Sequence, residues 1–352
     1  MKKLLSFIGC TAVVIVFLIT SCTKEGPQGP PGANGQNGKD ANATCTLCHN
    51  FSDTIVAKIF QYDASQHATG TTTFENRNTC APCHTSQGFI EVVGTGKDTT
   101  AVAIQDAAPI NCRTCHKIHN AYDRTDWELR TTAAFTNRIG GTTDLTTDQG
   151  DATGNLCARC HQARKPNPWL TNPTSTTDTL NITNFRWGPH YGTQSLILGG
   201  QGAFEIGAFD GPGAYRNSYH KGKASCVMCH GANAVGNLTG GHTLWLANEE
   251  EGDNFNGCNS TGCHTGLNTF DYDGKQTEVA EKIATLEEKL LAVGMLDSAT
   301  HYLVKGKYCQ KQLAVWWNYK LVVYDRSLGV HNTKYVLDMT QAGIDFFTTL
   351  GY

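Results

Sequence analysis

The chain has 352 residues, enough for one large or two modest domains, and its net charge of -3 excludes the strongly basic surface of a nucleic-acid-binding protein. Charged residues make up only 17%, and 37 glycines favour turns and irregular backbone over a long central core. The 15 cysteines and 13 histidines indicate an oxidising compartment, because so many thiols are rare in a reducing cytosol.

Residues 1–21 predict a signal peptide. Two lysines follow Met1, the apolar run from Leu4 to Ile19 is short for a spanning helix, and a small polar stretch ends it. The segment LITSC, which ends at Cys22, resembles the lipobox of bacterial lipoproteins and implies a lipid on that cysteine. The alternative is a plain signal peptide with an incidental cysteine. We expect a cell-envelope protein, lipid-anchored to the outer membrane and either periplasmic or surface-exposed.

Residues 22–40 predict a linker. Glycine occupies every third position from Gly26 to Gly38, and prolines fill the first triplets, which is a collagen-like pattern. Five triplets are too few for a stable triple helix on their own. We therefore expect an extended stalk rather than a trimerisation module.

Residues 41–274 hold five regular Cys-x-x-Cys-His motifs, the attachment pattern of c-type haem. Two thiols one helical turn apart can reach the two vinyl groups on one edge of a porphyrin. The next residue can then offer its imidazole to the iron. The thioether cysteines and proximal histidines expected from these motifs are Cys45, Cys48 and His49; Cys80, Cys83 and His84; Cys112, Cys115 and His116; Cys157, Cys160 and His161; and Cys226, Cys229 and His230.

A sixth motif, CNSTGCHTG, has four residues between Cys258 and Cys263 in place of two. The cysteine–histidine adjacency is kept at His264, and Gly262 gives the longer loop backbone freedom. The spacing resembles that in the tetrahaem cytochromes of sulfate reducers. The alternatives are a disulfide between these two cysteines and, for the regular motifs, zinc sites or a disulfide framework. Neither needs a histidine after every second cysteine, so the sequence predicts about six haem c groups.

Seven histidines remain for the second axial position of six irons. A second strong ligand gives an electron-carrying, low-spin haem, whereas an open position favours substrate chemistry. We expect His301 to be the spare, since Lys305 and Lys307 lie close to it on a predicted helix. His119, one helical turn after His116, should reach a neighbouring haem rather than its own. The distal candidates are His67, His119, His190, His220, His242 and His331.

Residues 275–352 predict a helical region that packs on the haem core. Apolar positions recur at helical spacing from Val279 onward, a second helical stretch covers about 298–325, and a third begins after Asn332 as N-cap. Cys309 is expected to be a buried thiol on an apolar helix face. The expected fold class is mainly α with extensive irregular coil, organised around stacked haems.

The order of these segments resembles the multihaem cytochrome superfamily that includes the pentahaem ammonia-forming nitrite reductase, hydroxylamine oxidoreductase and the octahaem reductases. The resemblance covers about 80–350 and implies distal roles for His220, His242 and His331. It implies the same less directly for His119 and for His190, which would cap the family's active-site position. No Cys-x-x-Cys-Lys motif is present, so no catalytic residue is carried over. The matching segments are RWGPHYGTQ (186–194), YHKGKASCVMCH (219–230), GGHT (240–243) and DRSLGVHN (325–332).

The sequence favours an electron-transfer protein whose partners are other redox proteins or cytochromes, with membrane contact through the lipid and no nucleic acid. The alternative is a reductase of a small nitrogen or sulfur oxyanion with one open haem. A structural surface lipoprotein with a collagen-like stalk is a third hypothesis. Whether the chain is an enzyme is undecided, although the surplus of histidines favours a carrier.

Mass spectrometry of haem peptides tests the sixth motif. We expect the peptide that contains Cys258 and Cys263 to carry one haem bound through both sulfurs, because the loop only has to bulge. A haem-free peptide with a disulfide between the two cysteines would contradict the prediction.

Overall fold

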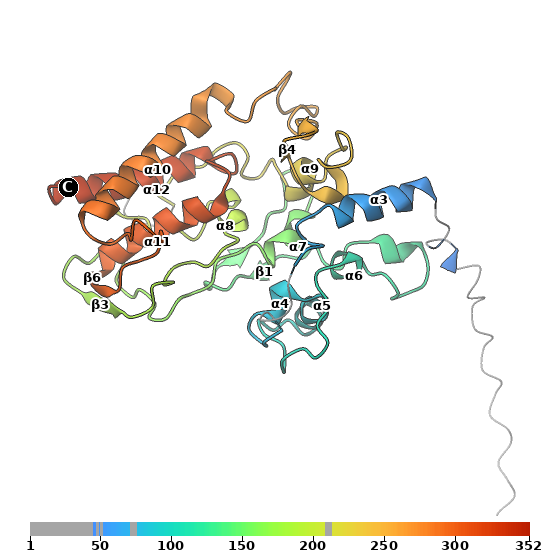
Figure 1. The fold of residues 1–352 in the computed structure, drawn as a ribbon, viewed down its shortest axis with the longest axis horizontal. Helices are drawn as coiled ribbons and strands as arrows, with labels where there is room; N and C mark the ends of the chain where they lie inside the picture. The colour runs from blue at the N-terminus through green and yellow to red at the C-terminus, as the bar shows by residue number, and fades with distance from the viewer. Residues whose placement is uncertain (1–44, 47–48, 50–51, 71–75, 208–212) are drawn as a thin grey trace, which may run out of the picture. The chain divides into compact units, whose positions relative to one another are not determined.

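The computed structural model describes residues 45–352 except 47–48, 50–51, 71–75 and 208–212 (Figure 1). The predicted signal peptide, the lipidation site Cys22, the stalk and Cys48 lie outside the described residues. The described part consists mostly of helix and coil with a few short strands, as the sequence predicts. In those ranges we find no helix long and apolar enough to cross a membrane.

Short helices carry four of the regular motifs: α4 (Ala81–His84), α6 (Cys112–Cys115), α7 (Gly154–Ala158) and α9 (Cys226–His230). Loops join them, and β1–β2 and β4–β5 form two-residue antiparallel pairs in this part of the chain. The other elements of this part are α3 (Asp53–Asp63), α5 (Ser86–Thr95), η2 (Arg124–Trp127), β1 (Phe135–Thr136), β2 (Thr142–Thr143), η4 (Gly241–Thr243), β4 (Ala247–Asn248) and β5 (Gly252–Asp253).

Side-chain caps begin several of these short helices. Asn111 Oδ1 accepts a hydrogen bond from the backbone N–H of Arg113 at 3.0 Å, which starts α6. Ser225 Oγ accepts one from the N–H of Met228 at 3.3 Å, which starts α9. A helix of one turn gains little from its own backbone bonds, so such caps matter to whether it forms.

Three long helices group together in the C-terminal part: α10 (Lys275–Ala292), α11 (Gln310–Asp325) and α12 (Thr333–Thr349) (Figure 1). α10 and α11 both pack on α12, and α8 (Gln194–Leu198) packs on α11. β3 (Thr179–Ile182) pairs antiparallel with β6 (Gly306–Cys309), and η5 (Tyr272–Gly274) precedes α10. α10 and α12 begin close to where the sequence predicts helices.

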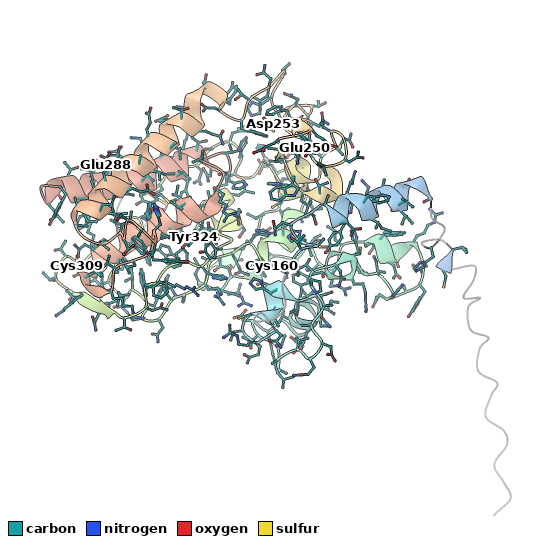
Figure 2. The ribbon with its side chains drawn as sticks, viewed as in Figure 1. Cys160, Glu250, Asp253, Glu288, Cys309 and Tyr324 are labelled. Carbon is teal, nitrogen blue, oxygen red and sulfur yellow. The ribbon has the colours of Figure 1, made fainter. Side chains whose placement is uncertain are left out.

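The helix predicted over about 298–325 is wrong in its first part. Residues 298–305 are irregular, and β6 follows before α11 begins. His301, predicted to lie on a helix, is exposed with φ of +54°. Cys309 is the last residue of β6 and the N-cap of α11, partly buried, and Figure 2 shows it beside β6 and away from Cys160. The cause is pairing with β3, which is remote in sequence and leaves no local pattern.

His119 also departs from its predicted helical turn. α6 ends at Cys115, His116 is extended, and His119 lies in a turn with φ of +63°. The buried carboxylate of Asp126 holds this turn, since it accepts hydrogen bonds from the backbone N–H groups of His119 at 2.8 Å and Ala121 at 2.7 Å. The sequence also predicts that His119 faces the haem of another motif, and that prediction does not require His119 to lie on a helix.

The apolar core lies in the C-terminal half. The main cluster of buried side chains comes from residues 163–215 and 279–347 and includes Trp316 and Trp317. Between residues 45 and 140, the described hydrophobic side chains that are buried are Ala81 and Phe89. Burial of so few apolar side chains cannot offset the conformational entropy that is lost when a segment of this length is ordered. The N-terminal half therefore needs another source of stability.

Lys320 gives a test of how this core tolerates charge. It is buried in α11, and its Nζ donates to the carbonyl oxygen of His301 at 3.2 Å and lies 4.3 Å from the ring centre of Tyr324. Burial lowers the pKa of Lys320 to about 8 from 10.5. Because the folded pKa is the lower one, the charged form destabilises the folded protein below pH 8, and this cost fades as the pH rises towards 10.5.

We expect Lys320→Met to raise the free energy of unfolding at neutral pH by about 1–2 kcal/mol, with a smaller gain at about pH 10. Denaturant unfolding followed by circular dichroism at both pH values measures this. Lys334→Met, at an exposed position of α12, is the control and should show no such pH dependence. A Lys320→Met protein less stable than the wild type at neutral pH would be the opposite result.

Candidate haem centres

Twelve of the 13 histidines form six pairs, each of a motif histidine and a histidine from elsewhere in the chain. Every proximal and every distal candidate from the sequence belongs to one pair, and His301 is outside the described pairs. The ring centroids are separated by 6.2 Å in His49–His119, 6.1 Å in His67–His161, 6.4 Å in His84–His190, 6.2 Å in His116–His242, 6.1 Å in His220–His264 and 6.4 Å in His230–His331.

The separation of the rings fits a metal ion between them. A metal–imidazole bond is about 2 Å long and the ring centre lies about 1.1 Å behind the nitrogen, so two rings on opposite sides of an ion lie about 6.2 Å apart. The angles between the ring planes range from 21° to 80°, yet the separations stay between 6.1 and 6.4 Å. A metal between two nitrogens fixes the distance and leaves the rotation free, which ring-on-ring packing does not.

Hydrogen bonds at Nδ1 leave Nε2 as the metal-binding atom in several of these rings. A carbonyl oxygen can only accept, so a ring whose Nδ1 bonds to one carries its proton there and has its lone pair on Nε2. The partners are Trp127 O at 2.6 Å for His116, Val330 O at 2.5 Å for His220, Leu244 O at 2.9 Å for His230, Gln194 Oε1 at 3.2 Å for His161 and Asp325 Oδ1 at 2.6 Å for His331.

Burial favours the neutral form, which a metal requires, in six of these twelve imidazoles. It lowers the pKa of His67 and of His190 to about 4. It also lowers the pKa of His161, His220, His230 and His242. His331 is different: burial acts to lower its pKa, but the charge and hydrogen bond of Asp325 outweigh burial and raise it.

The motifs share one closing hydrogen bond, from the backbone N–H of the histidine to the carbonyl oxygen of the first cysteine. In the long motif His264 N lies 2.9 Å from Cys258 O, although two more residues intervene. Gly262 has φ of +84° within that loop, so it supplies the freedom that the sequence predicts. In four of the regular motifs the same N···O distance is 2.7 Å for His49 and Cys45, 3.2 Å for His84 and Cys80, 2.9 Å for His116 and Cys112, and 3.0 Å for His161 and Cys157.

No disulfide joins the described cysteines, Cys258 and Cys263 included. This finding is against a disulfide in the sixth motif and against a disulfide framework in the described part of the chain. The same residues contain no group of three or more histidine, cysteine or acidic side chains placed to hold a metal ion. A tetrahedral zinc site needs four such ligands, so the described motifs do not form one.

The fourth motif touches both the second and the fifth. Cys83 Sγ lies 3.8 Å from Arg159 O and Cys160 Sγ lies 3.9 Å from Pro82 O, a reciprocal contact of α4 and α7. A hydrogen bond from Cys160 lowers the pKa of Cys83 to about 7. Cys226 Sγ lies 4.0 Å from Gly154 O, which brings α9 against α7.

The remaining motifs also have neighbours. Burial, followed by the charge of Cys157, raises the pKa of Cys115 to about 12, so the third motif lies within electrostatic reach of the fourth. Burial and then the charges of Cys258 and Cys263 raise the pKa of Cys229 to about 11, so the fifth motif lies within electrostatic reach of the sixth. The first motif meets the third through His119, which follows His116 in the chain.

Two polar side chains that the sequence reasoning missed orient the fourth and fifth pairs. Gln194 Oε1 faces His161, while its Nε2 donates to the carbonyl oxygens of Tyr324 at 3.1 Å and Asp325 at 3.3 Å. The carboxylate of Asp325 bonds His331. Gln194 and Asp325 both lie in segments that carry the family resemblance, and this position is the sequence feature that could have identified them.

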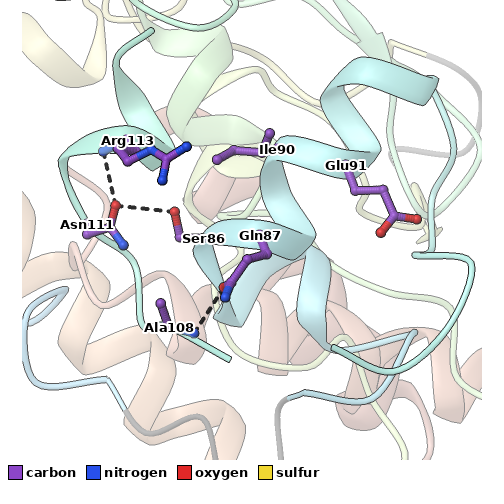
Figure 3. Close-up of a pocket in the computed structure, with 7 residues that line it drawn as sticks. All are labelled: Ser86, Gln87, Ile90, Glu91, Ala108, Asn111 and Arg113. Atoms are coloured by element: carbon purple, nitrogen blue, oxygen red, sulfur yellow. Dashed lines mark hydrogen bonds between the residues drawn. The ribbon is translucent and has the colours of Figure 1, made fainter. Parts of the chain in front are cut away.

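A surface cavity of about 330 Å³ lies between α5 and α6 (Figure 3). Its polar groups bond to one another, as Ser86 Oγ does to Asn111 Oδ1 at 3.2 Å. No histidine of a pair lines it, so this cavity gives no access to the candidate centres. The lining residues are Ser86, Gln87, Ile90, Glu91, Ala108, Asn111 and Arg113.

No protein-family model and no curated protein matches the chain. Among solved structures it is similar to one titled "Crystal Structure of Outer Cell Wall Cytochrome OcwA", with 17% sequence identity and a TM-score of 0.48. The match covers 82% of this chain and 49% of that chain, so this chain spans about half the length of that protein. A likeness of this size carries no argument about function, which rests on the chain's own cysteines and histidines.

Replacement of Gly240 tests whether the loop before His242 has room for a side chain. Gly240 has φ of +79° and ψ of -177°, a region that other residues avoid, and a Cβ there would lie 2.8 Å from Ala232 O. We expect Gly240→Ala to lower the free energy of unfolding by about 2–4 kcal/mol. Gly252→Ala is the control, since Gly252 has φ of +84° but nothing within 4 Å of a Cβ, and it should cost about 1 kcal/mol. Equal losses in thermal unfolding would contradict the argument.

Proposed function

We propose that this chain is a multihaem c-type cytochrome that carries electrons through six covalently bound haems, each with two histidine ligands. The observation that carries this proposal is the set of six histidine pairs, in which each motif histidine faces one other histidine at 6.1–6.4 Å. Haem iron, when bound, would supply reversible one-electron chemistry. The protein's part is to hold the groups close together and to set their potentials.

The residues proposed to hold each haem follow from the motif and its pair. The two cysteines of a motif form the thioethers and its histidine is the proximal ligand. The distal ligands are His119 for the first motif, His190 for the second, His242 for the third, His67 for the fourth, His331 for the fifth and His220 for the sixth.

The contacts between motifs support an order of transfer. The series first, third, fourth, fifth and sixth follows the contact at Cys226, the position of His119 just after the third motif, and the electrostatic interactions of Cys115 and Cys229 with the cysteines of the next motif. The second centre touches the fourth through Cys83 and would form a side branch. Electrons that enter at either end of the series would pass the fourth centre, which makes the fourth motif a junction.

The alternative function, reduction of a small nitrogen or sulfur oxyanion, requires an iron with an open position. Each proximal histidine has a partner that could fill that position, so no specific observation favours the reductase over the carrier. The location proposed from the sequence is the cell envelope, with residues 1–21 removed and Cys22 lipidated. The redox partners would be other redox proteins or cytochromes.

Carbon monoxide and electron paramagnetic resonance test the carrier proposal, because both detect an iron that lacks a second ligand. We expect six low-spin haems per wild-type chain and little binding of carbon monoxide to the reduced protein. His190→Ala should convert one haem to the high-spin form and add about one carbon monoxide site per chain. His301→Ala is the control and should behave as the wild type. Stoichiometric binding to the wild type would favour the reductase.

A further inference from the structure

We infer that Asp325 lowers the reduction potential of the centre formed by His230 and His331, which makes the fifth centre a low-potential step in the series. The inference rests on the proposed function, because it concerns an iron that those two histidines would share. It assigns to one buried carboxylate the role of a positioning and tuning residue.

The carboxylate of Asp325 is built into the site. Its Oδ1 lies 2.6 Å from His331 Nδ1, and its side chain is only 1% exposed. Ser327 Oγ donates a hydrogen bond to the other oxygen, Oδ2. Among the described ion pairs, His331 is the one partner of Asp325, and the neighbouring Arg326 is exposed to solvent. The negative charge is therefore directed at the imidazole rather than neutralised by a lysine or arginine.

The other rings with a described Nδ1 partner have neutral ones. His116, His220 and His230 bond to backbone carbonyl oxygens, and His161 bonds to the amide oxygen of Gln194. A neutral acceptor orients the ring and does little more. A carboxylate also draws the Nδ1 proton towards itself, so Nε2 becomes a stronger donor to a metal. Among these five rings, His331 alone has a carboxylate partner.

Both effects of Asp325 act in one direction. Oxidised iron carries one more positive charge than reduced iron, so a buried negative charge nearby stabilises the oxidised form. A more basic imidazole ligand favours the same form. Because little water reaches Asp325, its charge is weakly screened. One electron enters or leaves the centre and no covalent bond changes, so the whole effect appears in the reduction potential.

Asp325→Asn tests the inference in the full-length protein with its haems. Asparagine keeps the shape and can still accept from Nδ1, but it removes the charge. We expect one of the six potentials to rise by at least a tenfold change in the reduction equilibrium, or about 59 mV for one electron. Potentiometric titration followed optically measures it, and one low-spin paramagnetic resonance signal should change with it.

Asp338→Asn is the matched control. Asp338 is also a buried carboxylate, but it pairs with Arg216 and touches no histidine of a pair. Its removal should leave the potentials of the six centres unchanged even if it weakens the fold. A general loosening of the C-terminal part would alter both variants alike, so it can be told from a change at one ligand.

Ser327→Ala gives a second variant with the opposite sign. Without the hydroxyl donor, more of the Asp325 charge acts on His331, so the same potential should fall. Six unchanged potentials in a fully haem-loaded Asp325→Asn protein, or a rise in Ser327→Ala, would overturn the inference and leave the proposed function intact. Failure of the proposed function would be recognised differently, by fewer than six haems in the wild type or by a wild-type haem iron that lacks a second ligand.

Discussion

In the proposed haem arrangement, the N-terminal half depends on pairs of imidazoles whose ring centroids lie 6.1–6.4 Å apart. Described residues 45–140 bury little hydrophobic surface beyond Ala81 and Phe89, so ordinary packing cannot order them. The pairs join segments that are far apart in the chain, such as His67 with His161. Six haems at these positions would act as the missing core, since flat apolar porphyrins would fill the spaces between short helices.

The C-terminal half has a conventional core, and it orients the centres beside it. α11 is buried around most of its surface, and its end supplies the Tyr324 and Asp325 carbonyls that fix Gln194. The same helix end presents the Asp325 carboxylate to His331. A rigid three-helix group therefore sets the environment of the fourth and fifth centres, while the first three rely on loops and caps.

The sequence indicates the motif histidines directly, because covalent haem attachment needs a fixed local spacing, and in the structure each of them faces one of the distal candidates. It does not predict which distal histidine faces which motif, since that depends on contacts such as His67 with His161, 94 positions later. The irregular segment around His301 and the β3–β6 pairing were missed for the same reason. His119 was assigned to a helical turn, but Asp126 holds it in a left-handed turn instead.

The long motif closes with the same amide bond, from His264 to Cys258, as its shorter counterparts. The number of residues between the two cysteines therefore does not define the motif. A pattern search with a fixed two-residue spacing would count five motifs in this chain and leave the sixth distal histidine, His220, without a partner. If the six pairs hold haems as proposed, such a search would shorten the electron path of this chain by one centre, and the unmatched histidine would reveal the omission.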